Sequence, residues 1–494
     1  MFKKILIANR GEIARRVIHA AREMGIATVA VYSDPDADSL AVKEADEAYP
    51  LNGIESAETY LDISKILKIA QDAKVDAIHP GYGFLSENAS FAEACQKAKI
   101  KFIGPEPKAL KLLGSKVASK KLGQKAKVPV VPGFEGELPH GKALQKLAEE
   151  IGYPLLIKAA AGGGGKGMRV VHKAEELEEM VAGAEREALA FFKDKTLFIE
   201  KYFENPKHIE VQVLGDEKGN LVHLFERECS VQRRHQKMIE ETPSPSLTPA
   251  LQKEICGAAL KIVKEAHYFS AGTVEFLLDS KGNFYFLEVN TRLQVEHPIT
   301  EMVTGVDLVK AQIRIAAGET LPFRQEDLSQ RGHSIECRLY AEDPENNFLP
   351  AEGSAAVLVE PVRPGVRIDS ALEEGKPILP FYDPMLAKLI VWGENREDAI
   401  RKMDALLRDF VLLGIRHNLD FLRFFLETKD FASGKYHTHS VSALMEKYQK
   451  GRETMRQALV SLVPQFPMRA AASPIQTLKS GSGFSPALEG FRNA

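Results

Sequence analysis

The sequence has few cysteines and almost no net charge, and each of these shortages excludes a class of protein. Its 494 residues contain only four cysteines, which are widely separated and include no CxxC pair: Cys95, Cys229, Cys256 and Cys337. This spacing predicts neither a disulfide framework nor a zinc site. The 65 basic and 68 acidic residues give a net charge of −3. A chain balanced in this way lacks the basic surface that nucleic acid or an anionic membrane requires.

The sequence also lacks an apolar run long enough to cross a membrane. The apolar stretch at the N-terminus is ended at once by Asn9 and Arg10. It is too short for the core of a signal peptide and instead predicts a first buried strand. We therefore expect a soluble, cytoplasmic protein with no nucleic-acid or membrane partner. The length predicts about three domains.

The first 115 or so residues alternate between strand and helix patterns. A strand at 4–8 leads to a helix with one apolar stripe, formed by Ile13, Val17, Ala21 and Met24. Further strands are predicted at 26–32, 75–79 and 100–103, and further helices at 60–73 and 87–99. This alternation predicts a doubly wound parallel sheet. The glycines of the loop 79–84 favour a ligand site at a strand end and plain turn chemistry equally, and no GxGxxG motif indicates a dinucleotide site.

The most informative stretch is the polar run from Glu288 to His297. It follows an aromatic, strand-like segment, so we expect an extended backbone to continue through it with a period of two residues. That period places five polar side chains on one face: Glu288, Asn290, Arg292, Gln294 and Glu296. A half-exposed surface strand is the alternative. It is disfavoured because a solvated face rarely mixes amides and both charges so regularly.

A hairpin is predicted just before this run. The segment 273–278 reads as a strand, and 279–283 has turn chemistry. A hairpin symmetric about Lys281 and Gly282 places Glu275 opposite Glu288, and Thr273 opposite Asn290. Two carboxylates facing each other repel unless a cation lies between them. Sparse oxygen ligands suit Mg²⁺ bound with a nucleotide's phosphates, which we favour over a purely structural carboxyl pair.

A glycine-rich loop at 162–167 lies between two predicted strands, at 155–158 and 169–171. Glycine lets backbone amides approach phosphate oxygens closely, so the loop suits a flap over a nucleotide. It is not a P-loop, because Gly167 and not Ser or Thr follows Lys166. A flexible linker is the alternative. Lys158 lies in a strand expected to be buried, where a bound phosphate would offset its charge; Lys116 is a weaker candidate.

Two further segments carry polar side chains at useful places. The segment 196–202 predicts a strand that ends at Glu200. A turn follows, and the free backbone groups there could read the edge of an adenine base. The stretch 225–239 is dense in charged and amide groups. A solvated face is the usual explanation of such a run, and an anion-binding wall is the interpretation that we favour. Nucleic acid is disfavoured because glutamates interrupt the run and few aromatics interleave with it.

These motifs together resemble biotin carboxylase, of the ATP-grasp superfamily. The resemblance rests on the segments 162–168, 198–202, 228–237 and 288–301, and also on 7–14, 79–83 and 335–338. It covers about residues 1–447 and implies an α/β ATP-grasp fold. The domains implied are an N-terminal doubly wound parallel-sheet domain at 1–115, an ATP-grasp domain at 116–330 that includes a glycine-loop lid at 131–203, and a C-terminal mixed α+β domain at 331–447. Residues 448–494 would form a mobile tail or a peripheral partner contact.

The resemblance implies a function and its cofactors. The chain would carboxylate biotin on a separate carrier protein, using ATP and bicarbonate and passing through carboxyphosphate. This is the first half-reaction of a biotin-dependent carboxylase such as acetyl-CoA carboxylase in fatty acid biosynthesis. ATP, Mg²⁺ or Mn²⁺, and biotin would be the cofactors. A biotin carboxyl carrier protein and carboxyltransferase subunits would be the partners, and the chain would form a homodimer.

The resemblance also assigns residues to each ligand. The ATP contacts would be Lys116, Lys158, Gly164, Gly165, Glu200, Lys201, Tyr202, Phe203, His208, Gln232, His235, Glu275 and Glu288. The metal ligands would be Glu275, Glu288 and Asn290. Bicarbonate would contact Lys237, Arg292, Gln294, Val295 and Glu296, with Glu296 as the general base and Lys237 and Arg292 also counted as catalytic. Arg338 would stabilise the biotin enolate, with Tyr82 near the biotin ring.

The sequence departs from the commonest bacterial acetyl-CoA carboxylase pattern at several positions. Lys166 stands where arginine is frequent, and the segments 292–294 and 382–385 look closer to propionyl-, methylcrotonyl- or pyruvate carboxylases. Relatives that carry their own biotin hold it in a Met-Lys-Met segment. No Met-Lys dipeptide occurs here, so we expect biotin on another polypeptide. The final acceptor stays open. Two alternatives remain, another ATP-grasp ligase and a non-catalytic nucleotide-binding scaffold.

Overall fold

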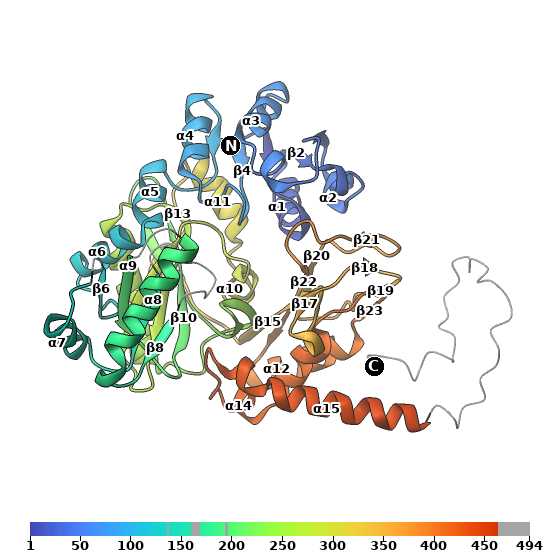
Figure 1. The fold of residues 1–494 in the computed structure, drawn as a ribbon. Coiled ribbons are helices and arrows are strands. Elements are labelled where there is room, and N and C mark those ends of the chain that lie inside the picture. The colour runs from blue at the N-terminus through green and yellow to red at the C-terminus, as the bar shows by residue number, and fades with distance from the viewer. Residues whose placement is uncertain (136–137, 160–167, 193–195, 463–494) are drawn as a thin grey trace.

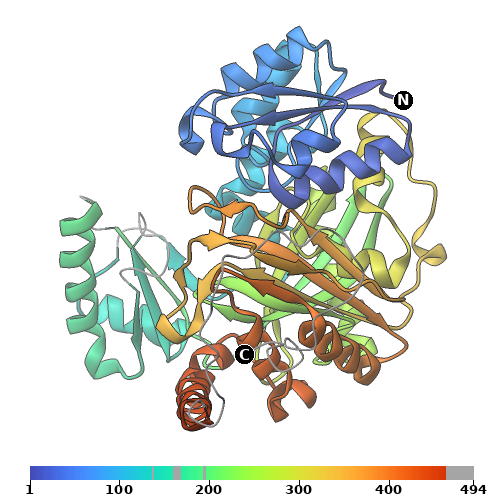
Figure 2. The same cartoon turned by 90° about the vertical axis from the view of Figure 1, so that its right-hand side faces the viewer.

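The computed structural model describes residues 1–135, 138–159, 168–192 and 196–462, and three larger sheets organise them. Figures 1 and 2 show an N-terminal unit at the top, a central unit below it, and a smaller unit projecting to one side. Within the described residues, no helix is long and apolar enough to span a bilayer. All four cysteines are buried and free.

The N-terminal unit is a five-stranded parallel sheet in the order β3-β2-β1-β4-β5. Its strands are β1 (Lys4–Ile7), β2 (Ala27–Tyr32), β3 (Glu47–Pro50), β4 (Ala77–His79) and β5 (Lys101–Phe102). Its helices are α1 (Gly11–Glu23), α2 (Leu40–Glu44), α3 (Ile63–Asp72), α4 (Ala89–Lys97) and α5 (Pro107–Gly114). The predicted doubly wound parallel sheet is confirmed, and β3 and α2 are elements that the sequence pattern did not predict.

The central unit is an eight-stranded antiparallel sheet in the order β14-β13-β10-β11-β12-β15-β22-β20. Its strands are β10 (Lys207–Gly215), β11 (Leu221–Arg233), β12 (Gln236–Thr242), β13 (Ser270–Leu278), β14 (Phe284–Asn290), β15 (His333–Tyr340), β20 (Val366–Ser370) and β22 (Met385–Gly393). The helices that pack on them are α6 (Lys116–Lys125), α9 (Pro249–Glu265), α10 (His297–Thr304) and α11 (Leu308–Ala316). The last three strands in this order come from the predicted C-terminal domain, so two predicted domains share one sheet.

The projecting unit is a four-stranded antiparallel sheet in the order β6-β9-β7-β8. It consists of β6 (Gly133–Glu135), β7 (Leu155–Ala159), β8 (Arg169–Val171) and β9 (Leu197–Lys201), with α7 (Lys142–Ile151) and α8 (Leu177–Phe192). A core of its own includes Leu155, Ile157 and Ile199. These elements occupy the predicted lid, and the predicted strands on both sides of the glycine loop are present. The loop itself lies outside the described residues, with Gly164 and Gly165 in it.

The C-terminal helices cover one face of β15 and β22. They are α12 (Arg396–Asp409), α13 (Leu419–Leu426), α14 (Lys429–Ala432) and α15 (Ser440–Leu462), and the short strands nearby are β16 (Glu342–Asp343), β17 (Leu349–Pro350), β18 (Gly353–Ser354), β19 (Val357–Val359), β21 (Pro377–Ile378) and β23 (Val411–Leu413). The segment expected to be a mobile tail or a peripheral partner contact is helical in its first part, because α15 continues through residues 448–462. Buried Tyr448 packs edge-on against Phe421 and ties this helix to the core.

The predicted extended strand through Glu296 is also wrong. Strand β14 ends at Asn290, and residues 291–296 form an irregular loop before α10. Because β14 is an edge strand, no further strand holds the backbone extended beyond this point. Thr291 instead donates its backbone N–H to Glu87 in the N-terminal unit. Pro298, at the start of α10, sets a helical φ and completes the change of direction.

A fully buried arginine ties the central strands together. Arg227 on β11 donates from Nε to Glu210 at 2.5 Å, and its other nitrogens reach Gln212 on β10 at 2.8 Å, Thr273 on β13 at 3.2 Å and Thr300 on α10 at 3.0 Å. Its side chain has no exposed surface. A buried cation is tolerated when its donors are satisfied, so these contacts fix three strands and a helix around one side chain.

Replacing Arg227 with methionine is therefore expected to loosen the sheet. Breaking one partner of a buried pair typically costs about 3–5 kcal/mol. The midpoint of thermal unfolding should fall, and amide hydrogen exchange should rise in β10, β11 and β13. Arg401→Met is the control, because the side chain of Arg401 is 69% exposed, and its effect should stay within about 0.5 kcal/mol. Unchanged exchange in the Arg227 variant would contradict this account.

Candidate active site

A row of charged side chains crosses four strands of the central sheet. Arg227 on β11 pairs in register with Glu210 on β10, Glu210 pairs with Glu275 on β13, and Glu275 pairs with Glu288 on β14. The predicted hairpin register is confirmed, because Glu275 lies opposite Glu288 and Thr273 lies opposite Asn290. Three carboxylates in adjacent strands repel one another, so the row depends on cations placed against it.

Lys237 supplies the cation closest to this row. Its Nζ lies 2.6 Å from Glu210, 3.0 Å from Glu275 and 2.7 Å from Glu296. A β-bulge between the Val231–Ile239 and Gln232–Lys237 pairs shifts the alternation of β12, so the lysine points to this face. Although burial opposes its charge, the three carboxylates raise the pKa of Lys237 well above the usual value.

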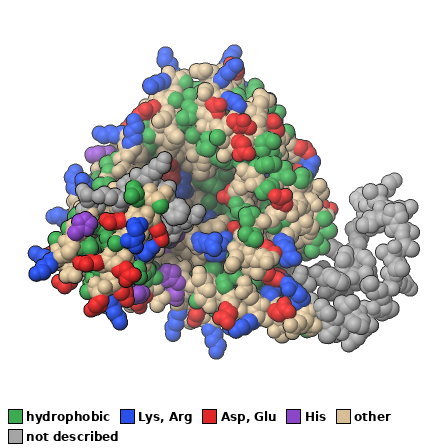
Figure 3. Space-filling model, viewed as in Figure 1, with side chains coloured by type: hydrophobic (Ala, Val, Ile, Leu, Met, Phe, Trp, Pro, Cys, Tyr) green, Lys and Arg blue, Asp and Glu red, His purple; other side chains and the backbone are tan. Residues whose placement is uncertain are grey.

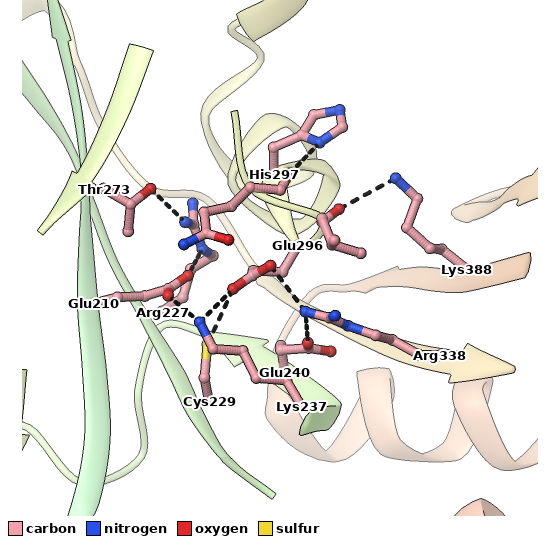
Figure 4. Close-up of polar contacts among 12 residues, drawn as sticks. Glu210, Arg227, Cys229, Lys237, Glu240, Thr273, Glu296, His297, Arg338 and Lys388 are labelled. Atoms are coloured by element: carbon pink, nitrogen blue, oxygen red, sulfur yellow. Dashed lines mark hydrogen bonds and ion pairs between the residues drawn. The ribbon is translucent and has the colours of Figure 1, made fainter. Parts of the chain in front are cut away.

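Glu296 lies at the centre of the site and is completely buried. One carboxylate oxygen accepts from Lys237 at 2.7 Å, and the other accepts from Arg338 at 2.9 Å (Figure 4). Burial alone would raise its pKa, but Lys237 and Arg338 hold the pKa of Glu296 well below its usual range. The ligand-free site thus keeps this carboxylate ionised between two cations.

Arg338 reaches the site from β15. Its Nη2 lies 2.5 Å from Glu240 and 2.9 Å from Glu296, and its Nη1 donates to the Tyr340 hydroxyl at 3.4 Å. The side chain is only 9% exposed. In spite of burial, the surrounding carboxylates raise the pKa of Arg338 well above its usual value. A guanidinium held in place by these contacts is suited to stabilise an anion beside it.

The irregular loop after β14 brings the remaining predicted side chains to the same place. Arg292 donates to Asn290 at 3.0 Å and to Gln294 at 3.0 Å, and its Nε donates to Glu87 at 2.8 Å. Gln294 in turn donates to Glu275 at 3.3 Å. The prediction that these polar groups share one face was based on a strand. The groups do converge, but through side-chain hydrogen bonds in a loop.

The predicted metal ligands lie together, and their chemistry fits a hard cation. Glu288 is half-buried, and burial together with the neighbouring Glu275 raises its pKa. A cation between the two carboxylates would relieve this repulsion. Asn290 lies beside them, donating to Glu275 at 2.9 Å. A second group, formed by His208, Glu210 and Glu275, has candidate ligand atoms within 4.8 Å of one another, but Lys237 already pairs with its two carboxylates.

The other predicted nucleotide residues lie further out, around the projecting unit. Lys158 is not an unpaired buried lysine as predicted: its side chain is 37% exposed and bonds Glu200 at 2.5 Å. Lys201 donates to the backbone carbonyl of Gly152 at 3.0 Å. The other side chains are placed as follows: Lys116 is exposed at the start of α6, Tyr202 stacks on His439, Phe203 packs on Tyr285, His235 is exposed, and Gln232 is buried against the Cys229 carbonyl. Figure 3 shows a hollow near the middle of this face, with basic side chains beside it.

Tyr82, predicted to lie near biotin, comes from the loop after β4. It is half-buried, and its ring lies 5.8 Å from the Nζ of Lys388 on β22. Lys388 is fully buried and donates to the carbonyl of Val295 at 3.2 Å. It also lies 3.1 Å from Glu12 on α1. One lysine thus connects the N-terminal unit, the C-terminal strands and the loop that carries Glu296.

Sequence reasoning missed several of these groups. The stretch 225–239 is not a solvated face, and Arg227 cannot line an anion-binding wall, because it is fully buried and paired with Glu210. Glu210, Glu240 and Lys388 were not predicted at all. Lys388 is a charged residue within an otherwise apolar strand, which is the one signal that the sequence offers for it, whereas Glu210 and Glu240 stand in strands that contain other polar residues. Their partners come from distant strands, so the signal does not identify a role.

Comparisons with known proteins agree with this geometry. Residues 1–110 match the family model described as biotin carboxylase, N-terminal domain, and residues 336–443 match the biotin carboxylase C-terminal domain. Residues 115–324 match the model described as carbamoyl-phosphate synthase L chain, ATP binding domain. Together the three matches span nearly all of the described chain.

Individual relatives are similar over almost their full length. The chain is 50% identical over 434 residues to biotin carboxylase 2 of Bacillus subtilis, covering 88% of this chain and 98% of that protein. It is 49% identical over 438 residues to the 2-oxoglutarate carboxylase small subunit of Hydrogenobacter thermophilus, covering 89% of this chain and 93% of that protein.

Solved structures agree at the level of the fold. The biotin carboxylase domain of a thermophilic 2-oxoglutarate carboxylase, bound to bicarbonate, is 47% identical with a TM-score of 0.86, covering 90% of this chain and 98% of that chain. Biotin carboxylase from Campylobacter jejuni, in a β-γ-ATP complex, is 46% identical with a TM-score of 0.84. The match covers 90% of this chain and 99% of that chain. The chain therefore belongs to the biotin carboxylase family of ATP-grasp ligases.

Proposed function

We propose that this biotin carboxylase transfers the carbon of bicarbonate to biotin in the cavity around Glu296. The observation that carries the proposal is the convergence of Glu296, Lys237 and Arg338 within hydrogen-bonding distance, beside the carboxylate row of Glu275 and Glu288. A base, two cations and an acidic edge for a metal–nucleotide complex are the parts that ATP-dependent carboxylation requires.

Each ligand of the proposed reaction is assigned to a different part of the structure. We assign nucleotide binding to the domain at 116–330, with the lid at 131–203 closing over it, and biotin binding to the edge formed by Tyr82 and Arg338. Glu275, Glu288 and Asn290 would hold Mg²⁺, which would offset the negative charge of the nucleotide's phosphates. In the ligand-free lid Lys158 pairs with Glu200, so nucleotide binding must replace that ion pair with a phosphate contact.

Glu296 acts as the base that accepts the proton of bicarbonate. The low pKa of Glu296 makes it a weak base, because Lys237 and Arg338 both stabilise its ionised form. A bicarbonate anion that binds Lys237, Arg292 and Gln294 competes for the same cations and so raises the basicity of Glu296. The deprotonated bicarbonate attacks the terminal phosphate of ATP and forms carboxyphosphate and ADP. Arg338 then stabilises the biotin enolate that accepts the carboxyl group.

The final acceptor of the carboxyl group is a separate question. Relatives of nearly equal identity are named for pyruvate, 2-oxoglutarate and methylcrotonoyl-CoA carboxylation. The proposal therefore concerns the half-reaction that these enzymes share, within a carboxylase of a 2-oxo acid or an acyl-CoA such as acetyl-CoA. None of the eleven methionines is followed by lysine, so this sequence contains no Met-Lys biotin acceptor and we assign biotin to a separate carrier.

The direct test of function uses free biotin as substrate. Biotin should stimulate bicarbonate-dependent ADP release by the purified chain, and labelled bicarbonate should appear in carboxybiotin. A chain that releases ADP without forming carboxybiotin would favour another ATP-grasp ligase. A chain that binds ATP and releases no ADP would favour a non-catalytic scaffold.

Two substitutions separate the two chemical steps. Arg338→Ala should lower carboxybiotin formation by about 10²–10³-fold, because the cation that stabilises the enolate is lost. Its bicarbonate-dependent ATP hydrolysis without biotin should survive, since carboxyphosphate forms earlier. Glu296→Ala should suppress both activities by about 10²–10⁴-fold. Arg324→Ala, at an arginine whose side chain is 83% exposed, is the control. Normal carboxylation in the Arg338 variant would remove its assigned role.

A third substitution tests the metal assignment. Glu288→Gln should raise the Mg²⁺ concentration needed for half-maximal activity at least about tenfold, because one of two carboxylate ligands is lost. The fold should be retained without loss of thermal stability, since the substitution removes one charge from a repelling pair. Glu265→Gln, at the end of α9 where the side chain is 37% exposed, serves as the matched control. An unaltered Mg²⁺ requirement in the Glu288 variant would contradict the site.

A further inference from the structure

The guanidinium of Arg338 lies between two carboxyl groups. Its Nη2 is 2.5 Å from Glu240 and 2.9 Å from Glu296, and both glutamates are completely buried (Figure 4). If both carboxyls are ionised, they more than balance the single positive charge of the arginine. An enolate that formed beside it would then meet no net positive charge.

Glu240 also has a carboxyl neighbour of its own. It lies directly opposite Glu336 in the β12–β15 register, so both side chains point to the same face of the sheet. Glu336 is completely buried as well. Apart from the ion pair between Glu240 and Arg338, none of the described residues donates a hydrogen bond to a carboxyl oxygen of Glu240 or of Glu336. Two ionised carboxyls in this position would be buried, close and unsolvated, which is costly.

The surrounding charges do not neutralise the pair. Three cations face it: Arg338 from β15, Lys237 from β12 and Lys388 from β22. Lys237 is shared by Glu210, Glu275 and Glu296, and Lys388 by Glu12 and Asp369. The other titratable groups that face the pair are Glu296 from the loop before α10, Cys229 from β11, and Cys337 and Tyr340 from β15. None of these adds a positive charge.

We propose that Glu240 and Glu336 share a proton, and that this proton prevents a net negative charge around Arg338 where the biotin enolate forms. The inference rests on the proposed function of Arg338. The two glutamates are positioning residues, because Glu240 contacts the arginine, Glu336 lies opposite Glu240 in the strand register, and neither is assigned a contact with the substrate. With the shared proton the pair carries one negative charge, which Arg338 offsets, whereas without it the pair carries two, and the resulting net negative charge disfavours the enolate.

The electrostatics of the site agree with a shared proton. Burial raises the pKa of Glu240 to about 7, and the nearby Glu296 carboxylate also raises it in spite of Arg338. Burial raises the pKa of Glu336 well above its usual value, with Glu240 adding to the effect. When Glu296 accepts a proton from bicarbonate, it stops competing for Arg338. The guanidinium then faces only the protonated pair, at the stage when the enolate must form.

The test compares pH profiles of the intact chain with free biotin. In the wild-type chain, biotin carboxylation should fall at alkaline pH as the pair loses its last proton. Glu240→Gln and Glu336→Gln each leave at most one ionisable carboxyl, so each should move this fall upward by about one pH unit or more. Bicarbonate-dependent ATP hydrolysis without biotin should keep its alkaline limit, because it does not use the charge of Arg338 for an enolate. Should one variant fail to fold, the other decides alone.

Glu226→Gln is the matched control. Glu226 is a buried glutamate on β11 whose carboxylate accepts from the Ser244 amide and the Gln252 side chain, with no contact to Arg338. It should leave the alkaline limit of carboxylation unchanged. If the two pair variants behave like this control, the proposal is overturned.

Infrared spectroscopy of the ligand-free protein provides a readout that does not depend on activity. The wild-type protein should show a protonated carboxyl band at pH 7 that disappears on alkaline titration, and the band should weaken in either pair variant. A wild-type protein with no carboxylic acid band at pH 7 overturns the proposal whatever the variants do. Failure of the proposed function is distinguishable, since the wild-type chain would then form no carboxybiotin while the infrared result still stands.

Discussion

The structure depends on keeping a group of buried carboxylates close together without letting their charges separate the strands. Glu210, Glu275 and Glu288 stand in register on adjacent strands, and Glu296 faces them from the loop. Arg227 at the end of the row and Lys237 beside it offset two of these four charges. In a low-dielectric interior both the repulsion and its compensation are strong. The central sheet is therefore stable only in the arrangement that also assembles the site.

This balance also explains why the site is ready for anionic substrates. At the site, Lys237 and Arg338 are each paired with the buried carboxylate of Glu296. In the proposed function, bicarbonate and phosphate groups would bring negative charge of their own, and a metal ion would bring positive charge to Glu275 and Glu288. Binding therefore exchanges one set of ion pairs for another, and the side chains are held in position beforehand. The same exchange applies at Lys158 and Glu200 in the lid.

The site is also a junction between units that are distant in the sequence. Arg338 and Lys388 lie opposite each other on β15 and β22, which extend the sheet that carries the carboxylate row. Lys388 reaches Glu12 in the N-terminal unit and the Val295 carbonyl beside Glu296. Glu87 holds Arg292 from the same unit. The N-terminal unit and the central sheet thus each contribute a group that fixes this loop, so the loop need not be a regular element.

The sequence by itself determined the parts that depend on local pattern. Strand and helix periodicity predicted the parallel N-terminal sheet, and turn chemistry with alternation predicted the hairpin that places Glu275 opposite Glu288. Family motifs identified Glu296 and Arg338, although the role of each stays a prediction. These features were readable because neighbouring residues, or residues across one tight turn, fix them.

Only the tertiary structure decided the rest. The loop at 291–296 looked like a strand because its polar residues alternate, yet its conformation is set by an edge position and by Glu87 from another unit. The continuous sheet that unites two predicted domains, the pairing of Glu240 with Glu336, and the burial of Arg227 all depend on strands far apart in the chain. When the sequence places a charged residue in a buried strand, it indicates that the residue needs a partner of opposite charge or a hydrogen-bonding group. Which partner it finds is decided by strand order and register, because these bring the compensating charge within reach.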